Sequence, residues 1–195
     1  MKHAVILAHP RPESFTASVA GAYVQAVRQL GHDVVLRDLY GIGFDPCLKA
    51  GEMPRAGFQP EADVMAERAL LADADVFALV YPLWLNAPPA MLKGYLERVF
   101  GLGFAYGGIN HKPIPMLTGR KLIAFSSSGA PLQWVKDSGA MDAVYTLFDE
   151  YLAQICGLTS LDHVHVGGLV PGASADFVHA RLADVEKTVN RHFGP

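Results

Sequence analysis

Cysteine is scarce in this chain of 195 residues, which contains only Cys47 and Cys156. These two stand in unrelated contexts without CxxC spacing, so we expect neither a disulfide framework nor a zinc site. Long apolar runs are missing as well. The most apolar window, 74–89, is interrupted by Asp75, Asn86 and several prolines, well short of the roughly 18 apolar residues that a membrane helix needs. We therefore expect no insertion into a membrane.

Charge is also low, with 16 Lys and Arg against 19 Asp and Glu, a net charge of −3 and 18% charged residues. The absence of a basic run excludes an electrostatic footprint for nucleic acid, so we expect small molecules or other protein chains as partners. Half of the residues (51%) are hydrophobic, which argues against disorder and predicts a single compact domain over residues 1–195. No signal-peptide pattern precedes the first apolar run, so we expect a cytoplasmic protein.

Short β-branched apolar runs alternate five times with longer segments of helical periodicity. The expected strands are 3–8, 33–37, 75–81, 120–127 and 159–166, and the expected helices are 15–30, 61–71, 87–100, 139–156 and 174–192. Strands that are separated by helices run parallel with right-handed crossovers. The sequence therefore predicts an α/β fold, a three-layer doubly wound sheet of five parallel strands in the order 2-1-3-4-5.

In such a sheet the ligand binds beyond the carboxyl ends of the strands, where the strand order reverses between strands one and three. The first loop there, residues 8–18, contains no glycine, which excludes the GxGxxG and GxxxxGK[ST] phosphate loops. What remains is a helix N-terminus with hydroxyls at Ser14 and Thr16, a natural site for one phosphate, with His9 beside it. The alternative is that Ser14 or Thr16 only caps the helix and that His9 is a structural hydrogen-bond partner.

Two further loops lie at the same edge of the predicted sheet. Residues 81–89 are rich in aromatic side chains and proline and offer a flat apolar wall for a planar cofactor, although Trp84 and Leu85 also suit ordinary packing. Residues 125–131 form a small, hydroxyl-rich turn that lets backbone N–H groups approach a ligand. Together, the three loops predict a cofactor site at this edge.

Several motifs carry a resemblance to a known family. They are Ala8-His9-Pro10 followed by Ser14-Phe15, then Phe44-Asp45-Pro46, and a long block from Tyr81-Pro82-Leu83-Trp84 through Lys93-Gly94-Tyr95-Leu96-Glu97-Arg98-Val99-Phe100 to Phe104-Ala105-Tyr106. On these residues the chain resembles the flavodoxin-like NAD(P)H:quinone oxidoreductases of the DT-diaphorase and modulator-of-drug-activity type, the flavodoxin-2 family. The resemblance covers most of the chain up to about the fourth strand.

The resemblance implies a flavin bound without covalent attachment. FAD is favoured by the long connection 40–60, and FMN is the alternative. The implied flavin contacts are His9, Ser14, Phe15 and Thr16 for the phosphate; Pro82, Leu83, Trp84, Leu85 and Asn86 for the ring; and Ser127, Ser128, Gly129 and Ala130 for its pyrimidine edge.

By the same resemblance, NAD(P)H reduces the flavin and leaves, and a quinone then takes two electrons in the same pocket, with nitro- or azo-aromatics as further acceptors. The backbone N–H groups of Ser128 and Gly129, together with Asn86, are the expected catalytic groups. The expected substrate contacts are Phe104, Tyr106 and Trp134, and Phe104, Tyr106 and Ile109 equally suit the interface of the homodimer that the resemblance implies.

Other functions stay open at this stage. A flavodoxin-like electron carrier is disfavoured by the His9-Pro10 loop and the low net charge, and a flavin-binding regulatory subunit of a transporter leaves no motif of its own. His163 and His165 alternate on the fifth strand and share a face, but no third ligand has a convincing spacing, so we expect no metal.

Overall fold

A computed structural model, which describes residues 1–53, 59–108 and 113–195, contains a sheet of five parallel strands in the order β2-β1-β3-β6-β7. These strands are β1 (Lys2–Leu7), β2 (Asp33–Asp38), β3 (Val76–Pro82), β6 (Lys121–Ser127) and β7 (Thr159–Val166). Two further strands, β4 (Tyr106–Gly107) and β5 (Ile114–Pro115), form a separate antiparallel pair. The predicted order 2-1-3-4-5 is confirmed, because β6 and β7 are the fourth and fifth strands of the main sheet.

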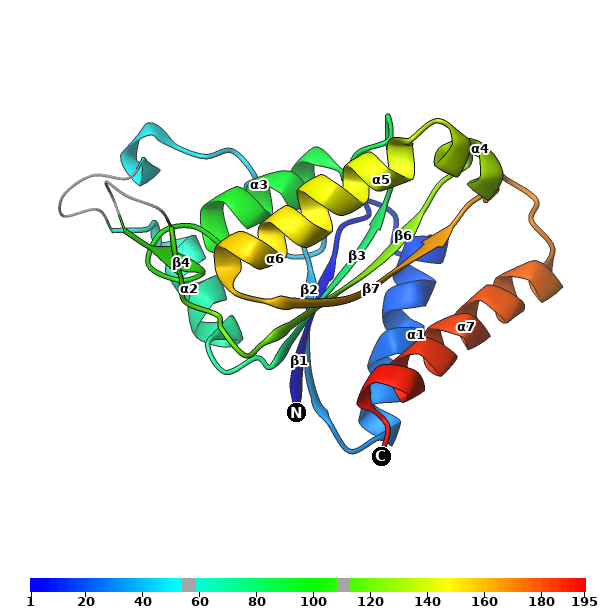
Figure 1. Cartoon of the computed structure of the whole chain (residues 1–195), viewed down its shortest axis with the longest axis horizontal. Coiled ribbons are helices and arrows are strands. Elements are labelled where there is room, and N and C mark those ends of the chain that lie inside the picture. The colour runs from blue at the N-terminus through cyan, green and yellow to red at the C-terminus, as the bar shows by residue number, and fades with distance from the viewer. Residues whose placement is uncertain (54–58, 109–112) are drawn as a thin grey trace.

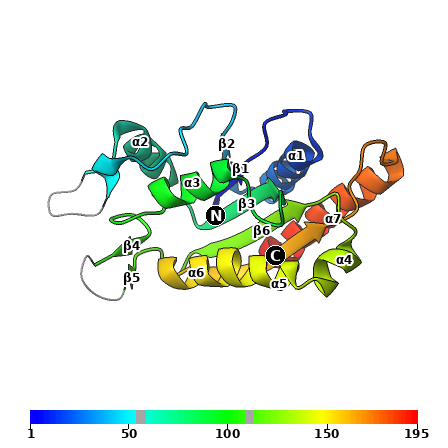
Figure 2. The same cartoon turned by 90° about the horizontal axis from the view of Figure 1, so that it is seen from above.

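Helices cover both faces of the sheet. On one face lie α1 (Phe15–Gln29) and α7 (Ala175–Phe193), and on the other lie α2 (Ala62–Leu71), α3 (Ala90–Val99), α5 (Ala140–Val144) and α6 (Tyr151–Cys156) (Figures 1 and 2). The side chains of β1 alternate accordingly: Val5 and Leu7 pack toward α1 and α7, whereas Ala4 and Ile6 pack toward the opposite layer. Burial on both faces explains why the strands read as continuous apolar runs.

Two of the predicted helices differ from the structure. Helix α3 begins at Ala90, after both prolines, and not at residue 87; the residue before a proline is held out of the helical region, so the helix starts only once Pro89 has been passed. The predicted helix 139–156 is α5 and α6 joined by a π-helical segment, η2 (Tyr145–Glu150). A short helix that we did not predict, α4 (Leu132–Asp137), lies beyond the carboxyl ends of β6 and β7 (Figure 1).

None of the helices in the described residues is both long and apolar enough to span a bilayer.

Candidate cofactor-binding site

A pocket of about 490 Å³ lies at the carboxyl ends of the strands, where the loops after β1, β3, β6 and β7 converge. Its lining residues are His9, Arg11, Glu13, Ser14, Phe15, Thr16, Pro82, Leu83, Trp84, Ser127, Ser128, Gly129, Leu169, Val170 and Pro171. The three loops singled out in the sequence therefore meet in one place. Of the predicted flavin contacts, Leu85, Asn86 and Ala130 are not among the lining residues.

The N-terminus of α1 forms one end of this pocket. Ser14 caps the helix, because its Oγ accepts a hydrogen bond from the backbone N–H of Ala17 at 3.1 Å. The capping alternative is thus correct for Ser14, but its hydroxyl proton is still able to donate to a ligand. Within the described chain, the backbone N–H groups of Phe15 and Thr16 have no acceptor. Two free amides at the positive end of a helix suit an anionic group.

His9 contributes a neutral donor beside that helix end. Its Nδ1 lies 3.0 Å from the backbone N of Arg11 and 3.2 Å from the Arg11 carbonyl oxygen. Burial lowers the pKa of His9, and the Arg11 charge lowers it further, although the nearby Arg11 carbonyl oxygen acts in the opposite direction by favouring a protonated ring. Because the neutral ring has one proton and the amide must donate, the shorter contact makes Nδ1 an acceptor and leaves the proton on Nε2.

The turn after β3 forms an apolar side wall. The ring of Trp84 lies 5.9 Å from that of His9, centroid to centroid, and Trp84 and Ala87 exchange two backbone hydrogen bonds of 2.9 and 3.1 Å. The two residues between them, Leu85 and Asn86, have φ of +52° and +57°, a left-handed conformation that is costly for a side chain such as leucine. Leu85 is fully exposed at the tip of the turn, which explains its absence from the pocket.

The loop after β6 requires a correction. We expected the backbone N–H groups of both Ser128 and Gly129 to be free, but that of Ser128 donates to the carbonyl of Val166 at 2.9 Å. The carbonyl of Ala130 is held by the N–H of Gly168 at 2.7 Å and by the Ser128 hydroxyl at 3.1 Å. Only the N–H of Gly129 is left without an acceptor among the described residues of this turn that line the pocket.

The predicted substrate contacts lie elsewhere in this chain. Phe104 packs edge-on against Phe100, and Tyr106 lines a second cavity described below. Trp134 lies half exposed on α4, outside the set of lining residues. Ile109 falls outside the described residues.

Sequence reasoning missed five residues of the pocket: Arg11, Glu13, Leu169, Val170 and Pro171. Arg11 and Glu13 stand inside the first loop, so the charge of Arg11 next to a predicted anion site was a usable signal, whereas Glu13 adds a charge of the opposite sign there. Leu169, Val170 and Pro171 follow β7, where the sequence has no motif and the resemblance has faded.

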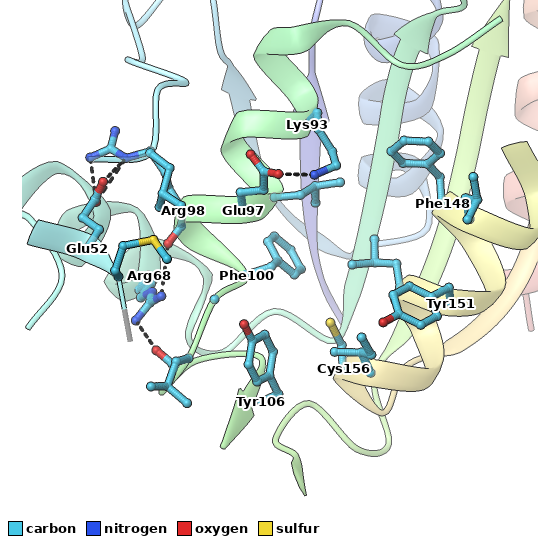
Figure 3. Close-up of a pocket in the computed structure, with 18 residues that line it drawn as sticks. Glu52, Arg68, Lys93, Glu97, Arg98, Phe100, Tyr106, Phe148, Tyr151 and Cys156 are labelled. Carbon is cyan, nitrogen blue, oxygen red and sulfur yellow. Dashed lines mark hydrogen bonds and ion pairs between the residues drawn. The ribbon is translucent and has the colours of Figure 1, made fainter. Parts of the chain in front are cut away.

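A second cavity, of about 350 Å³, lies between α3, α6 and β4 (Figure 3). Its walls are largely apolar and include Phe100, Tyr106, Phe148 and Tyr151. Its charged groups are already paired: Lys93 bonds Glu97, and Arg68 donates to three backbone carbonyls at 2.9 to 3.1 Å. This cavity therefore offers apolar area and few free polar groups.

In the part of the chain that the structure describes, no group of three or more His, Cys, Asp or Glu side chains is arranged to hold a metal ion.

Comparison with known proteins agrees with this geometry. Residues 1–189 match the flavodoxin-2 family model, described as a flavodoxin-like fold. An uncharacterized NAD(P)H oxidoreductase of Haemophilus influenzae is 34% identical over 83% of this chain and 81% of its own length.

Solved structures give the same result. An NAD(P)H:quinone oxidoreductase from Methanothermobacter marburgensis is 26% identical, with a TM-score of 0.85 over 99% of this chain and 96% of its own. An FMN-dependent NADH-azoreductase from Bacillus anthracis, solved in complex with FMN, shares the fold at 18% identity, with a TM-score of 0.73 over 97% of this chain and 98% of its own. The extent of the family match and the closeness of the Haemophilus relative show that this chain belongs to the flavodoxin-2 family.

Proposed function

We propose that this protein is a flavin-dependent NAD(P)H:quinone oxidoreductase. The observation that carries the proposal is the pocket at the carboxyl edge of the sheet, which has a helix N-terminus with free amides at one side and an apolar wall at the other. Relatives named NAD(P)H oxidoreductase and NAD(P)H:quinone oxidoreductase support the same chemistry.

The residues of this pocket fit a flavin. The amides of Phe15 and Thr16, with Nε2–H of His9 and the Arg11 side chain, suit the phosphate. Pro82, Leu83 and Trp84 supply a flat apolar wall for the ring, and the free N–H of Gly129 supplies a donor for its polar edge.

When bound, the flavin supplies the two-electron transfer from NAD(P)H to the acceptor. The chain's own residues hold it, orient it and leave one face for NAD(P)H and the quinone to occupy in turn. Nitro- and azo-aromatics are a further class of acceptor, in line with the azoreductase among the structural neighbours. Because NAD(P)H is a reductant of the cytoplasm, we place the protein there.

The identity of the flavin is a separate point of the proposal. The long connection between β2 and α2 favours FAD, whereas the FMN complex among the neighbours favours FMN. Release of the flavin by heat, followed by chromatography against both standards, distinguishes them.

We further propose a homodimer in which a second copy covers the cavity of Figure 3. Leu147 and Tyr151 border this cavity and are 60% and 57% exposed, a large apolar surface for a monomer. Since the polar groups there are already paired, an apolar partner surface fits best, and Phe104 and Tyr106 then lie near the interface.

A substitution at the helix end tests the proposed site. Ser14→Asp keeps a good N-cap but places a negative charge where the phosphate should bind, so flavin affinity should fall by more than about tenfold, or ~1.4 kcal/mol. Quinone reduction at limiting flavin should fall in proportion. Both are measured by fluorescence titration and by steady-state rates.

The matched control is Ser174→Asp, which changes the N-cap of α7, where Ser174 accepts from the N–H of Phe177. This variant should bind flavin like the wild type. If Ser14→Asp kept the full flavin affinity, the flavin phosphate would not bind at this helix end.

A further inference from the structure

A chain of buried and partly buried side chains runs under the loop after β6 and ends in the proposed flavin pocket. Asp149 Oδ2 lies 2.5 Å from His163 Nδ1, and His163 Nε2 lies 2.6 Å from Ser126 Oγ. Ser126 Oγ lies 2.8 Å from His165 Nδ1, and His165 Nε2 lies 2.9 Å from the Oγ of Ser128. Ser128 lines the pocket, so the four hydrogen bonds connect a buried carboxylate to the pocket wall.

A bulge in the sheet brings these residues together. Between Leu122 and Ile123 the register of β6 against β7 shifts by one residue, and Ser126 then pairs with His165. Side chains at paired positions share a face, so without this shift both histidines would point to the opposite side of the sheet. Asp149 comes from the π-helical segment, an irregularity that is frequent at functional sites.

The end of this chain of hydrogen bonds that carries Asp149 and His163 is closed to solvent. The side chains of Asp149 and His163 are 1% and 2% exposed, and the other Asp149 oxygen has no partner among the described residues. Tyr81, which pairs with Ser126 on the neighbouring strand, is also buried with its hydroxyl unpaired. Burial, reinforced by Asp149, raises the pKa of Tyr81 well above its ordinary value, so this phenol does not supply a proton.

His165 conducts a proton without storing one. Burial lowers the pKa of His165 to about 4, and the neighbouring His163 contributes to this shift. A neutral imidazole between two hydroxyls passes a proton by accepting it on one nitrogen and releasing it from the other. The Asp149–His163 pair is the place on this chain where a buried carboxylate and a buried imidazole lie close enough, 2.5 Å apart, to share a proton.

The donor and acceptor pattern has two consistent directions. In the first direction, His163 Nδ1–H donates to Asp149, and the Ser126 hydroxyl donates to His163 Nε2. His165 Nδ1–H then donates to Ser126, and the Ser128 hydroxyl donates to His165 Nε2, so all four donors point toward the carboxylate. One additional proton on the pair makes His163 Nε2–H a donor, which reverses each bond beyond it. The Ser128 hydroxyl then turns from His165 to the Ala130 carbonyl, 3.1 Å away.

Ser126, His163 and Asp149 also have the order of a hydrolytic triad, but they lack what a nucleophile requires. Ser126 is 4% exposed, does not line the pocket, and bonds a second histidine. A substrate carbonyl has no route to its oxygen, so the serine bridges two imidazoles and does not attack.

We propose that the residues Asp149, His163, Ser126, His165 and Ser128 form a proton relay that stores one proton beneath the flavin pocket and delivers it through Ser128. This inference rests on the proposed function. Reduction of a quinone to a hydroquinone takes an electron pair and two protons: NAD(P)H supplies the pair with one proton as hydride, and solvent must supply the other. The relay takes up this second proton from water while the pocket is open and releases it to the quinone oxygen.

The first experiment tests the relay in the flavin-free full chain, independently of any activity. Histidine ¹⁵N NMR across a pH titration should show His165 exchanging its proton from Nδ1 to Nε2 in step with protonation of the Asp149–His163 pair. In Ser126→Ala the hydroxyl that bridges the two rings is missing, so the tautomer of His165 should no longer change when the Asp149–His163 pair gains a proton. A single His165 tautomer over the whole titration of the wild type would overturn the relay.

The second experiment tests its coupling to the pocket in the flavin-loaded protein. Anaerobic reduction by one equivalent of NADH, in weak buffer with a pH indicator, should take up about one proton per flavin in the wild type and less than half as much in Ser126→Ala. Ser126→Thr, which keeps the hydroxyl, should restore the uptake. His192→Gln, which removes a histidine bonded to Asp162 outside the relay, should match the wild type.

The outcomes separate the two proposals. If neither NADH nor NADPH reduces the bound flavin, the proposed function is wrong, and the NMR titration still decides the relay. If Ser126→Ala and the wild type take up the same number of protons on flavin reduction, the relay does not deliver its proton to the pocket, even when NMR shows the change of the His165 tautomer. Asp149→Asn, which removes the store at similar volume, replaces Ser126→Ala in both tests if that variant does not fold.

Discussion

The absence of a side chain at Gly94 allows two segments of the chain to pack in close contact. A Cβ built on this glycine of α3 would lie 2.0 Å from the carbonyl oxygen of Pro46 and 2.6 Å from its Cβ. The Phe44-Asp45-Pro46 element is therefore seated on α3, with the Phe44 ring edge-on to Tyr95 at 4.9 Å. This one of the motifs that carried the family resemblance is a packing motif, since none of its three residues lines the cofactor pocket.

Replacing Gly94 with alanine should consequently destabilise the fold. The clash is with backbone and forces the element off α3, so the free energy of unfolding should fall by about 2–3 kcal/mol, measured by urea denaturation. The control is Gly21→Ala in α1, where an added Cβ meets no atom within 4 Å. That change should raise the free energy of unfolding by about 0.5–1 kcal/mol, because alanine is the better helix former. Equal effects at the two sites would contradict the seating of Pro46 on Gly94.

At the scale of residues, sequence reasoning located the side of the pocket formed by the N-terminus of α1 better than the side formed by the loop after β6. Ser14 and Thr16 were predictable because the loop after the first strand leads into a helix, which fixes where the N-terminus of that helix lies, whereas Phe15 came from the resemblance. The N–H of Ser128 was not predictable, since its pairing with Val166 depends on how the loop after β7 packs. The left-handed conformation of Leu85 was equally hidden, because leucine rarely adopts it, whereas Asn86 is a residue type that tolerates it.

At the scale of secondary-structure elements, Arg98 of α3 anchors the connection between β2 and α2 to this helix. Its guanidinium, 0% exposed, donates to Glu52 at 2.9 to 3.1 Å, to Asp63 at 2.7 and 3.0 Å, and to the Asp45 carbonyl at 2.6 Å. Burial by itself would raise the pKa of Glu52, but the hydrogen bonds from Arg98 and from the Lys49 backbone N–H outweigh it and lower the pKa.

This pKa shift predicts the direction of a pH effect. A carboxyl whose pKa is lower in the folded state contributes stability above its unfolded pKa, near 4.3, and loses it as the pH falls through the folded value. Glu52→Gln should therefore cost about 3 kcal/mol at pH 7, and the gap to the wild type should narrow below about pH 4. Urea denaturation at several pH values measures both. The control is Glu97→Gln, which breaks an exposed ion pair with Lys93 and should lower the free energy of unfolding by less than about 1 kcal/mol. A loss of unfolding free energy in Glu52→Gln that does not change with pH would contradict the assigned role of the Glu52 carboxylate.

Element boundaries show where local patterns stop being informative. The spacing of apolar residues over 139–156 predicts a helix but does not reveal the extra residue of a π-helical turn. The bulge in β6 and β7 is also absent from the local pattern, because it is a property of the pair and not of either strand. Both irregularities act on the proposed relay, since one carries Asp149 and the other turns the histidines toward it.

For the whole molecule, topology was the most predictable feature. Five apolar runs separated by helices admit few parallel arrangements, and the observed order is the predicted one. The substrate wall was less predictable: Phe104 and Tyr106 lie beside the second cavity and not in the cofactor pocket, which is intelligible if that region faces another copy of the chain.

The proposed homodimer gives a prediction at this scale. Leu147→Asp places a charge on the exposed apolar surface beside the second cavity, where it would be buried without a partner in the dimer. Light scattering should give twice the chain mass for the wild type and the chain mass for the variant at micromolar concentration. A wild-type monomer, or a variant that remains dimeric, would contradict this interface. Leu36→Asp, at an exposed leucine of β2 outside the cavity, is the control and should stay dimeric.

The central claim is that the pocket holds a flavin that exchanges electron pairs between NAD(P)H and a quinone. Its most direct test is an anaerobic titration of the flavin-reconstituted protein with NADPH and then NADH, followed by a simple quinone, with the flavin absorbance recorded throughout. We predict rapid loss of the oxidised flavin band with at least one donor and its full return after one equivalent of quinone. Bound flavin that neither donor bleaches would contradict the claim and favour an electron carrier or a regulatory flavoprotein.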